Sequence, residues 1–137
     1  MLLALSGCSA PDPQAEAAGF DEIYAILSQH CGACHVQGAA EGPWSLDTPP
    51  GPDWFPVCLE RPAADQARCA TYHQLVDAPG PGIPPWIRPD DATGSEPYVQ
   101  ACEPAQSFHI GHSLPAALPA SDCGRLLEWI VAGARWE

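Results

Sequence analysis

Proline limits where this chain can form regular structure. The sequence holds 17 prolines and 12 glycines among 137 residues, and a proline inside a helix or a sheet removes a hydrogen-bond donor and disrupts the element. Dense runs such as EGPWSLDTPPGPDWFP (residues 41–56) and APGPGIPPWIRPDDATGSEP (residues 78–97) are therefore expected to be loops. We expect an all-α fold of few short helices with long Pro/Gly-rich connections.

Three stretches place apolar residues at helical spacing, and they cover residues 19–35, 64–77 and 120–136. The positions expected to be buried in the first are Phe20, Ile23, Ile26 and Leu27. Those expected in the second are Cys69, Tyr72, Leu75 and Val76. Those expected in the third are Leu126, Leu127, Ile130, Val131 and Ala134, with Ser121 as the N-cap.

The start of the chain and its cysteines predict an exported protein. Seven cysteines in a chain of this size indicate disulfides formed outside the cytosol. The opening MLLALSGC resembles a bacterial lipobox, in which the Cys8 thiol would carry the lipid. No basic residue precedes this apolar run, so a chance match or a misplaced start is the alternative. We expect residues 1–19 to be a signal remnant and flexible tether, and residues 20–137 to form one domain.

These features together predict a location and a class of partner. The expected location is the cell envelope, facing the periplasm, with membrane contact through the lipid anchor alone. The outer membrane is mildly favoured because Ser9, not an aspartate, follows Cys8. The net charge of -12 argues against nucleic acid, whose phosphates need basic side chains. Such acidity indicates either plain solubility or a redox protein partner with a basic docking face.

The stretch SQHCGACHVQG, residues 28–38, contains a C-x-x-C-H sequence formed by Cys31, Cys34 and His35. This is the attachment signature of c-type haem. Two thiols one backbone turn apart can add to the two vinyl groups of the porphyrin, and the histidine that follows is placed to bind the iron as its proximal ligand. One copy of the motif predicts one covalently attached haem c.

Two other chemistries also use paired cysteines. A thioredoxin-like dithiol follows a strand and precedes a helix, whereas here a helix is expected before the motif and a Pro-rich loop after it. A zinc site needs further paired ligands, and the chain has no second C-x-x-C. We therefore favour haem, and the redox dithiol and the zinc site remain as alternatives.

The haem motif and the closing LLEWIVAGA, residues 126–134, resemble the single-haem cytochrome c domains of bacterial exported proteins, especially the planctomycete-type branch. The resemblance spans residues 20–137, and its specific motifs lie at the two ends. It implies an all-α cytochrome c fold in which the first and last helices cross and the haem sits in a cleft between loops. The small Ala132, Gly133 and Ala134 would either permit close helix approach or simply end the helix.

In that family the sixth iron ligand is usually the methionine of a Met-Pro step before the last helix. Met1 is the only methionine of this chain and lies in the expected signal region, while Leu114-Pro115 occupies the place of Met-Pro. A leucine has no lone pair for iron, so a histidine or an open position must take this role. We expect the distal ligand to be His112, with His109 and His73 as alternatives, and His30 to bond a haem propionate or solvent.

Four cysteines remain after the haem motif, and two disulfides among them allow three pairings. We favour Cys58–Cys69 and Cys102–Cys123, each joining a Pro-rich loop to a helix. Each bridge would stabilise the fold by about 2–4 kcal/mol, mainly by restricting the unfolded chain.

The favoured function is a lipid-anchored c-type cytochrome that passes single electrons between redox partners. The alternative is a gas or peroxide sensor, or a peroxidase-like protein, with an open sixth iron position. A third hypothesis is a haem-bearing accessory subunit of a larger surface complex. No nucleophile–base pair and no phosphate-binding loop supports hydrolase or transferase activity, so we expect an electron-transfer protein rather than an enzyme.

Overall fold

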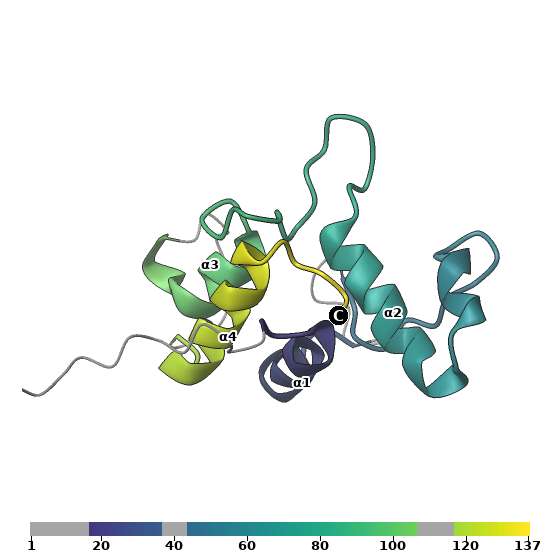
Figure 1. Ribbon diagram of the computed structural model, residues 1–137, viewed down its shortest axis with the longest axis horizontal. Coiled ribbons are helices and arrows are strands. Elements are labelled where there is room, and N and C mark those ends of the chain that lie inside the picture. The colour runs from purple at the N-terminus through teal and green to yellow at the C-terminus, as the bar shows by residue number, and fades with distance from the viewer. Residues whose placement is uncertain (1–16, 37–43, 107–116) are drawn as a thin grey trace, which may run out of the picture.

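The computed structural model describes residues 17–36, 44–106 and 117–137. Over these residues the chain forms four α-helices and two 3-10 helices and contains no strand (Figure 1). The elements are α1 (Phe20–Cys31), η1 (Pro56–Glu60), α2 (Ala63–Val76), α3 (Glu96–Cys102), η2 (Pro104–Gln106) and α4 (Ala120–Val131). The prediction of an all-helical fold is confirmed for this part of the chain. Of the helices described, none is long and apolar enough to cross a bilayer.

Helix α1 forms where the spacing of its apolar residues predicts it. All four expected positions are buried, and acidic Asp21 and Glu22 lie in the first turn, where they favour the positive end of the helix. Phe20 contacts the ring of Trp129 in α4, and Glu22 binds Arg125 of the same helix. His30 at the other end of α1 binds Asp122 near the start of α4. This order of contacts shows that α1 and α4 pack in opposite directions.

Helix α4 and the turn after it bury three of the five residues expected on this face, Ala134 among them. Leu126 and Ile130 are buried as predicted, but Leu127 and Val131 are 38% and 58% exposed. Trp129 occupies the core in their place, with its indole N–H donating to the carbonyl oxygen of Arg135 at 2.7 Å. The prediction was wrong for Leu127 and Val131 because a run of consecutive apolar residues fits several helical faces, and only docking against α1 selects one.

The structure also determines where α4 begins and how it ends. The predicted Ser121 cap is wrong, because the helix begins one residue earlier, at Ala120, with Pro119 as its N-cap. At the other end Gly133 has a φ of 96°, its amide donates to Ile130, and the amide of Ala134 donates to Trp129. This pair of bonds is the Schellman arrangement that ends a helix. Gly133 and Ala134 therefore terminate α4, as the second of the two alternatives predicts.

Helix α2 carries η1 on one side and the core on another. Cys69 and Leu75 are buried as predicted, while Tyr72 and Val76 are half-buried. The structure also buries Thr71, whose hydroxyl donates to the carbonyl oxygens of Ser45 and Ala67. Thr71 was not expected in the core because its burial depends on this loop contact.

Both predicted disulfides are present. Cys58 in η1 is joined to Cys69 in α2, and Cys102 is joined to Cys123 in α4, with Cα atoms 5.6 and 5.7 Å apart. Cys102 was expected in a loop, but it is the last residue of α3, a short helix that the sequence did not predict. The second bridge therefore joins two helices.

The chain after α4 closes the core. Figure 1 shows this yellow segment running from α4 to a position between α1 and α2. The carbonyl oxygen of Trp136 accepts a hydrogen bond from the amide of Phe20 at 3.0 Å, and that of Ala134 accepts one from the Tyr72 hydroxyl at 3.1 Å. The Phe20 ring, which is fully buried, contacts the rings of Tyr72 and Trp136 with centroids 5.1 and 5.7 Å away. One aromatic cluster thus joins both ends of the described domain.

Two glycines of the last helical region give a matched test of the helix ending. Gly133→Ala should lower the free energy of unfolding by about 1–3 kcal/mol, because alanine is strained at a φ of 96°. Gly124→Ala should raise it by about 0.5–1 kcal/mol, because Gly124 lies inside α4 and an added Cβ meets no atom within 4 Å. Denaturant unfolding measures both. A Gly133→Ala variant as stable as wild type would contradict the assignment of Gly133 as the helix terminator.

Candidate functional site

The Cys31, Cys34 and His35 motif lies at the end of α1. Cys31 is the last residue of the helix, and its carbonyl oxygen accepts hydrogen bonds from the amides of Cys34 and His35 at 3.2 and 2.9 Å. The motif therefore forms a single tight turn. Gly32 has an ordinary right-handed φ of -63°, so flexibility is not its role. A Cβ at this position would instead overlap the carbonyl oxygen of Ser28.

His35 is held in one orientation inside the protein. Its side chain is buried, with the residue only 8% exposed, and its ring lies flat against the indole of Trp44 at a centroid distance of 3.8 Å and an angle of 8°. Nδ1 lies 3.1 Å from the carbonyl oxygen of Trp44. Because a carbonyl oxygen only accepts, Nδ1 carries the proton in this bond, and the lone pair of a neutral ring is on Nε2. This is the tautomer that a histidine uses when it binds a metal through Nε2.

The segment that holds His35 is itself fixed by two helices. The amide of Leu46 donates to the carbonyl oxygen of His35 at 2.8 Å, and the carbonyl oxygen of Leu46 accepts the Tyr24 hydroxyl of α1 at 2.7 Å. From α2, Gln74 bonds both the amide and the carbonyl oxygen of Ser45, at 3.0 and 3.2 Å. The site is thus supported from both sides. Sequence reasoning missed Trp44, because nothing in the spacing of a Pro-rich loop marks one aromatic residue as the neighbour of His35.

The environment of Cys31 distinguishes among the chemistries open to paired cysteines. Cys31 and Cys34 are not joined as a disulfide. Burial, with a smaller effect of the neighbouring Cys34, raises the pKa of the Cys31 thiol to about 11. A redox dithiol works as a thiolate and needs a lowered pKa, whereas a bound metal ion itself deprotonates its thiol ligands. The surroundings of Cys31 therefore disfavour a redox dithiol.

Two of the other four histidines, His30 and His73, lie among the described residues. His30 bonds Asp122 at 2.8 Å, which links α1 to α4, and the contact with a haem propionate or solvent expected for it stays a prediction. The Nδ1 atom of His73 lies 2.8 Å from a carboxylate oxygen of Asp77, and its ring stacks on Phe55 beside η1. His109 and His112 lie outside the described residues, as does Cys8.

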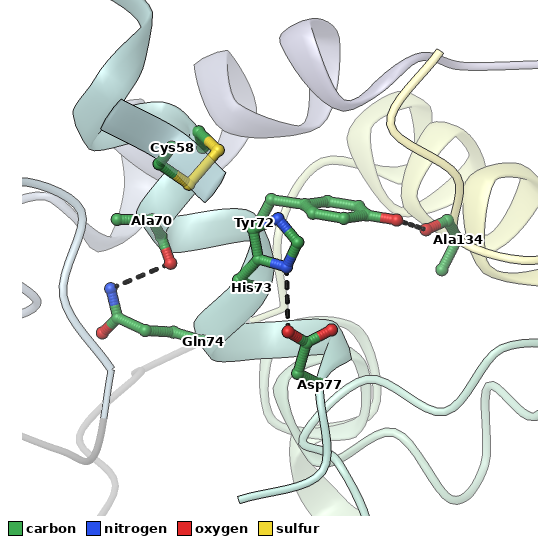
Figure 2. Close-up of polar contacts among 8 residues, drawn as sticks. Cys58, Ala70, Tyr72, His73, Gln74, Asp77 and Ala134 are labelled. Atoms are coloured by element: carbon green, nitrogen blue, oxygen red, sulfur yellow. Dashed lines mark hydrogen bonds and ion pairs between the residues drawn. A yellow bond between two sulfur atoms is a disulfide. The ribbon is translucent and has the colours of Figure 1, made fainter. Parts of the chain in front are cut away.

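A second group of metal-binding residue types lies at α2 and η1. The sulfur atoms of Cys58 and Cys69 and a ring nitrogen of His73 lie within 4.8 Å of one another (Figure 2). The two cysteines form a disulfide in this structure. The sequence does carry a signal for part of this group, because Cys69, His73 and Asp77 recur every fourth residue and so share one face of the helix.

The raised pKa of Cys31 makes a prediction for the haem-free chain. Its thiol should stay protonated near neutral pH, so alkylation by iodoacetamide should be slow there and should accelerate as the pH approaches about 11. Mass spectrometry of the Cys31 peptide measures the rate. The urea-unfolded chain is the control, because its thiol is solvated and should react faster near neutral pH. Equal rates in the folded and unfolded chain would contradict the burial argument.

Comparison with known proteins does not add to these observations. No protein-family model, curated protein or solved structure matches the chain. Function is therefore inferred from the residues themselves: two motif cysteines that are not joined as a disulfide, and a buried histidine whose Nδ1 is bonded to a backbone carbonyl.

Proposed function

We propose that this chain is a single-haem c-type cytochrome that transfers electrons at the bacterial cell envelope. In this proposal Cys31 and Cys34 attach one haem c through thioether bonds, and His35 is the proximal iron ligand. The observation that carries it is the hydrogen bond from Nδ1 of His35 to the Trp44 carbonyl oxygen, within a C-x-x-C-H turn. A cytochrome c-like arrangement of the helices, as implied by the sequence resemblance, is part of the same proposal.

The residues present fit this group in three respects. The turn after α1 holds both cysteines and the histidine together. The buried surroundings of Cys31 disfavour a charged thiolate and tolerate a neutral thioether. The Trp44 contacts fix the ring of His35, and its Nδ1 bond leaves the lone pair on Nε2, the atom that would bind the iron.

Haem, when bound, supplies an iron centre that gains or loses one electron. The chain would contribute a buried histidine whose ring is held by Trp44. Because His35 is stacked and hydrogen-bonded, its ring should keep the same orientation in both oxidation states of the iron. A small structural rearrangement between these states favours fast electron exchange. Burial around the iron ligand is one of the features by which a protein sets the potential of a haem.

The sixth ligand in this proposal is His112. Methionine is ruled out in the rest of the chain because the sequence has none after Met1. His73 is the weaker candidate, because its ring is engaged by Asp77 and Phe55 at the η1 side of α2. With histidine on both sides the potential should lie below that of a Met/His cytochrome, because thioether ligation raises it. His109 remains the alternative on the same segment.

The envelope location completes the proposal. Lipidation of Cys8 would tether the domain through residues 9–19, leaving its surface open to soluble or membrane-bound redox partners. The net charge of -12 favours a partner whose docking face is basic. Screening by salt should then slow electron transfer to that partner.

Covalent attachment is the first test. Expressed with a haem-attachment system, the wild-type chain should carry one haem that stays bound after denaturation, as measured by intact mass and haem absorbance. Cys31→Ser/Cys34→Ser should lose the covalent haem. Cys102→Ser/Cys123→Ser is the matched control, which should keep the haem and lose only stability, by about 2–4 kcal/mol. A wild-type chain without covalent haem would overturn the proposal.

Carbon monoxide separates the carrier from a sensor or peroxidase. If His112 fills the sixth position, the ferrous wild type should bind carbon monoxide slowly, and His112→Ala should bind it rapidly. His109→Ala is the control and should resemble the wild type. Rapid binding by the wild type would instead support the open-site alternative. Stopped-flow absorbance of the reduced protein gives both rates.

A further inference from the structure

The disulfide between η1 and α2 has neighbours that a purely structural bridge does not need. The ring nitrogen of His73 lies within 4.8 Å of both sulfur atoms, and His73 is in turn bonded to Asp77 at 2.8 Å. Among the described residues this is the one group of three such side chains that could hold a metal ion. The Cys102–Cys123 bridge has no such neighbour in that part of the chain. The difference points to chemistry at the first bridge.

We propose that Cys58, Cys69 and His73 form a zinc site when their disulfide is reduced. Two thiolates and one imidazole are the nitrogen and sulfur ligands that Zn²⁺ prefers, and three protein ligands leave the fourth position to water. The inference does not depend on haem attachment at Cys31 and Cys34.

The geometry of α2 preorganises this site. Cys69 and His73 are four residues apart on the helix, so their side chains lie one turn above the other on the same face. Cys58 approaches from η1 and is fully buried. The two Cα atoms of the pair are 5.6 Å apart. The thiols need to separate only by side-chain rotation to bind an ion.

Asp77 fixes the state of His73 that a metal requires. A carboxylate only accepts, so Nδ1 of His73 donates to it, and a neutral ring then has its lone pair on Nε2. Figure 2 shows this second nitrogen turned away from Asp77. A carboxylate behind a ligand histidine is a recurring support of zinc sites. Phe55 covers one face of the ring, while the side chain of His73 remains 24% exposed, which leaves access for water.

Reduction of the disulfide and binding of the ion are two successive steps. An external dithiol gives two electrons and two protons to the Cys58–Cys69 bond, which becomes two thiols, and the dithiol becomes a disulfide. Zn²⁺ then binds the two sulfurs as thiolates and two protons leave to solvent. The ion replaces the covalent bond, so η1 remains attached to α2 in both states.

Cobalt reports on such a site directly. The full-length chain, reduced with tris(carboxyethyl)phosphine, should bind Co²⁺ with an absorption from sulfur-to-cobalt charge transfer, and Zn²⁺ should displace it. The oxidised chain should not show this absorption. His73→Ala should weaken binding by more than about 10-fold, and Asp77→Asn by about 10-fold. Cys102→Ser/Cys123→Ser is the matched control and should bind Co²⁺ like the wild type.

Two results would overturn the inference. One is a reduced wild type whose cobalt absorption is unchanged by His73→Ala, which would place any bound ion at Cys31 and Cys34. The other concerns folding: if reduction lowers the helix content measured by circular dichroism, Zn²⁺ should restore it in the wild type and not in His73→Ala, because metal binding contributes folding free energy. Failure to restore it in the wild type would equally exclude the site.

Discussion

The packing of Phe20 joins more of this fold than any other contact. Its fully buried ring contacts aromatic rings from α2, from α4 and from the segment after α4, and its amide binds the carbonyl oxygen of Trp136. Aromatic side chains bury large apolar areas, and pairs of them add about 0.5–1.5 kcal/mol beyond burial. A small chain with so many prolines has little other regular structure that could stabilise the fold. The first residue of α1 therefore fixes where the last residues of the chain lie.

The candidate haem site depends on that packing. Once α1 is docked, its final residue places the turn of Cys31, Cys34 and His35, and Tyr24 on the same helix binds the Leu46 carbonyl oxygen. Leu46 and Trp44 then hold His35 from the other side. The rigidity of the histidine is thus a consequence of helix docking. The proposed zinc site at Cys58 and Cys69 lies where η1 packs on α2, and Gln74 of the same helix supports the loop beside His35. Both sites therefore depend on α2, but they share no ligand.

The acidic composition makes the few cations structurally important. All five basic residues are arginines. Arg125 binds Glu22 across the α1–α4 contact and holds the pKa of that carboxyl below its usual value. Arg68 binds Asp21 and also lies over the ring of Trp136, with its guanidinium carbon 5.3 Å from the centroid. These contacts use positive charge to join helices.

The sequence by itself determined the elements that depend on neighbours along the chain. Apolar spacing placed α1, α2 and α4 to within a few residues, the C-x-x-C-H motif located the candidate site, and both disulfide pairings were as expected. Only the tertiary structure decided what lies against what. It placed Trp44 on His35, put Trp129 in the core in preference to Val131, and brought His73 to the Cys58–Cys69 bridge. The physical reason is that helical periodicity is a local property, whereas the face that becomes buried and the loop that covers a side chain are chosen by the packing of segments far apart in the sequence.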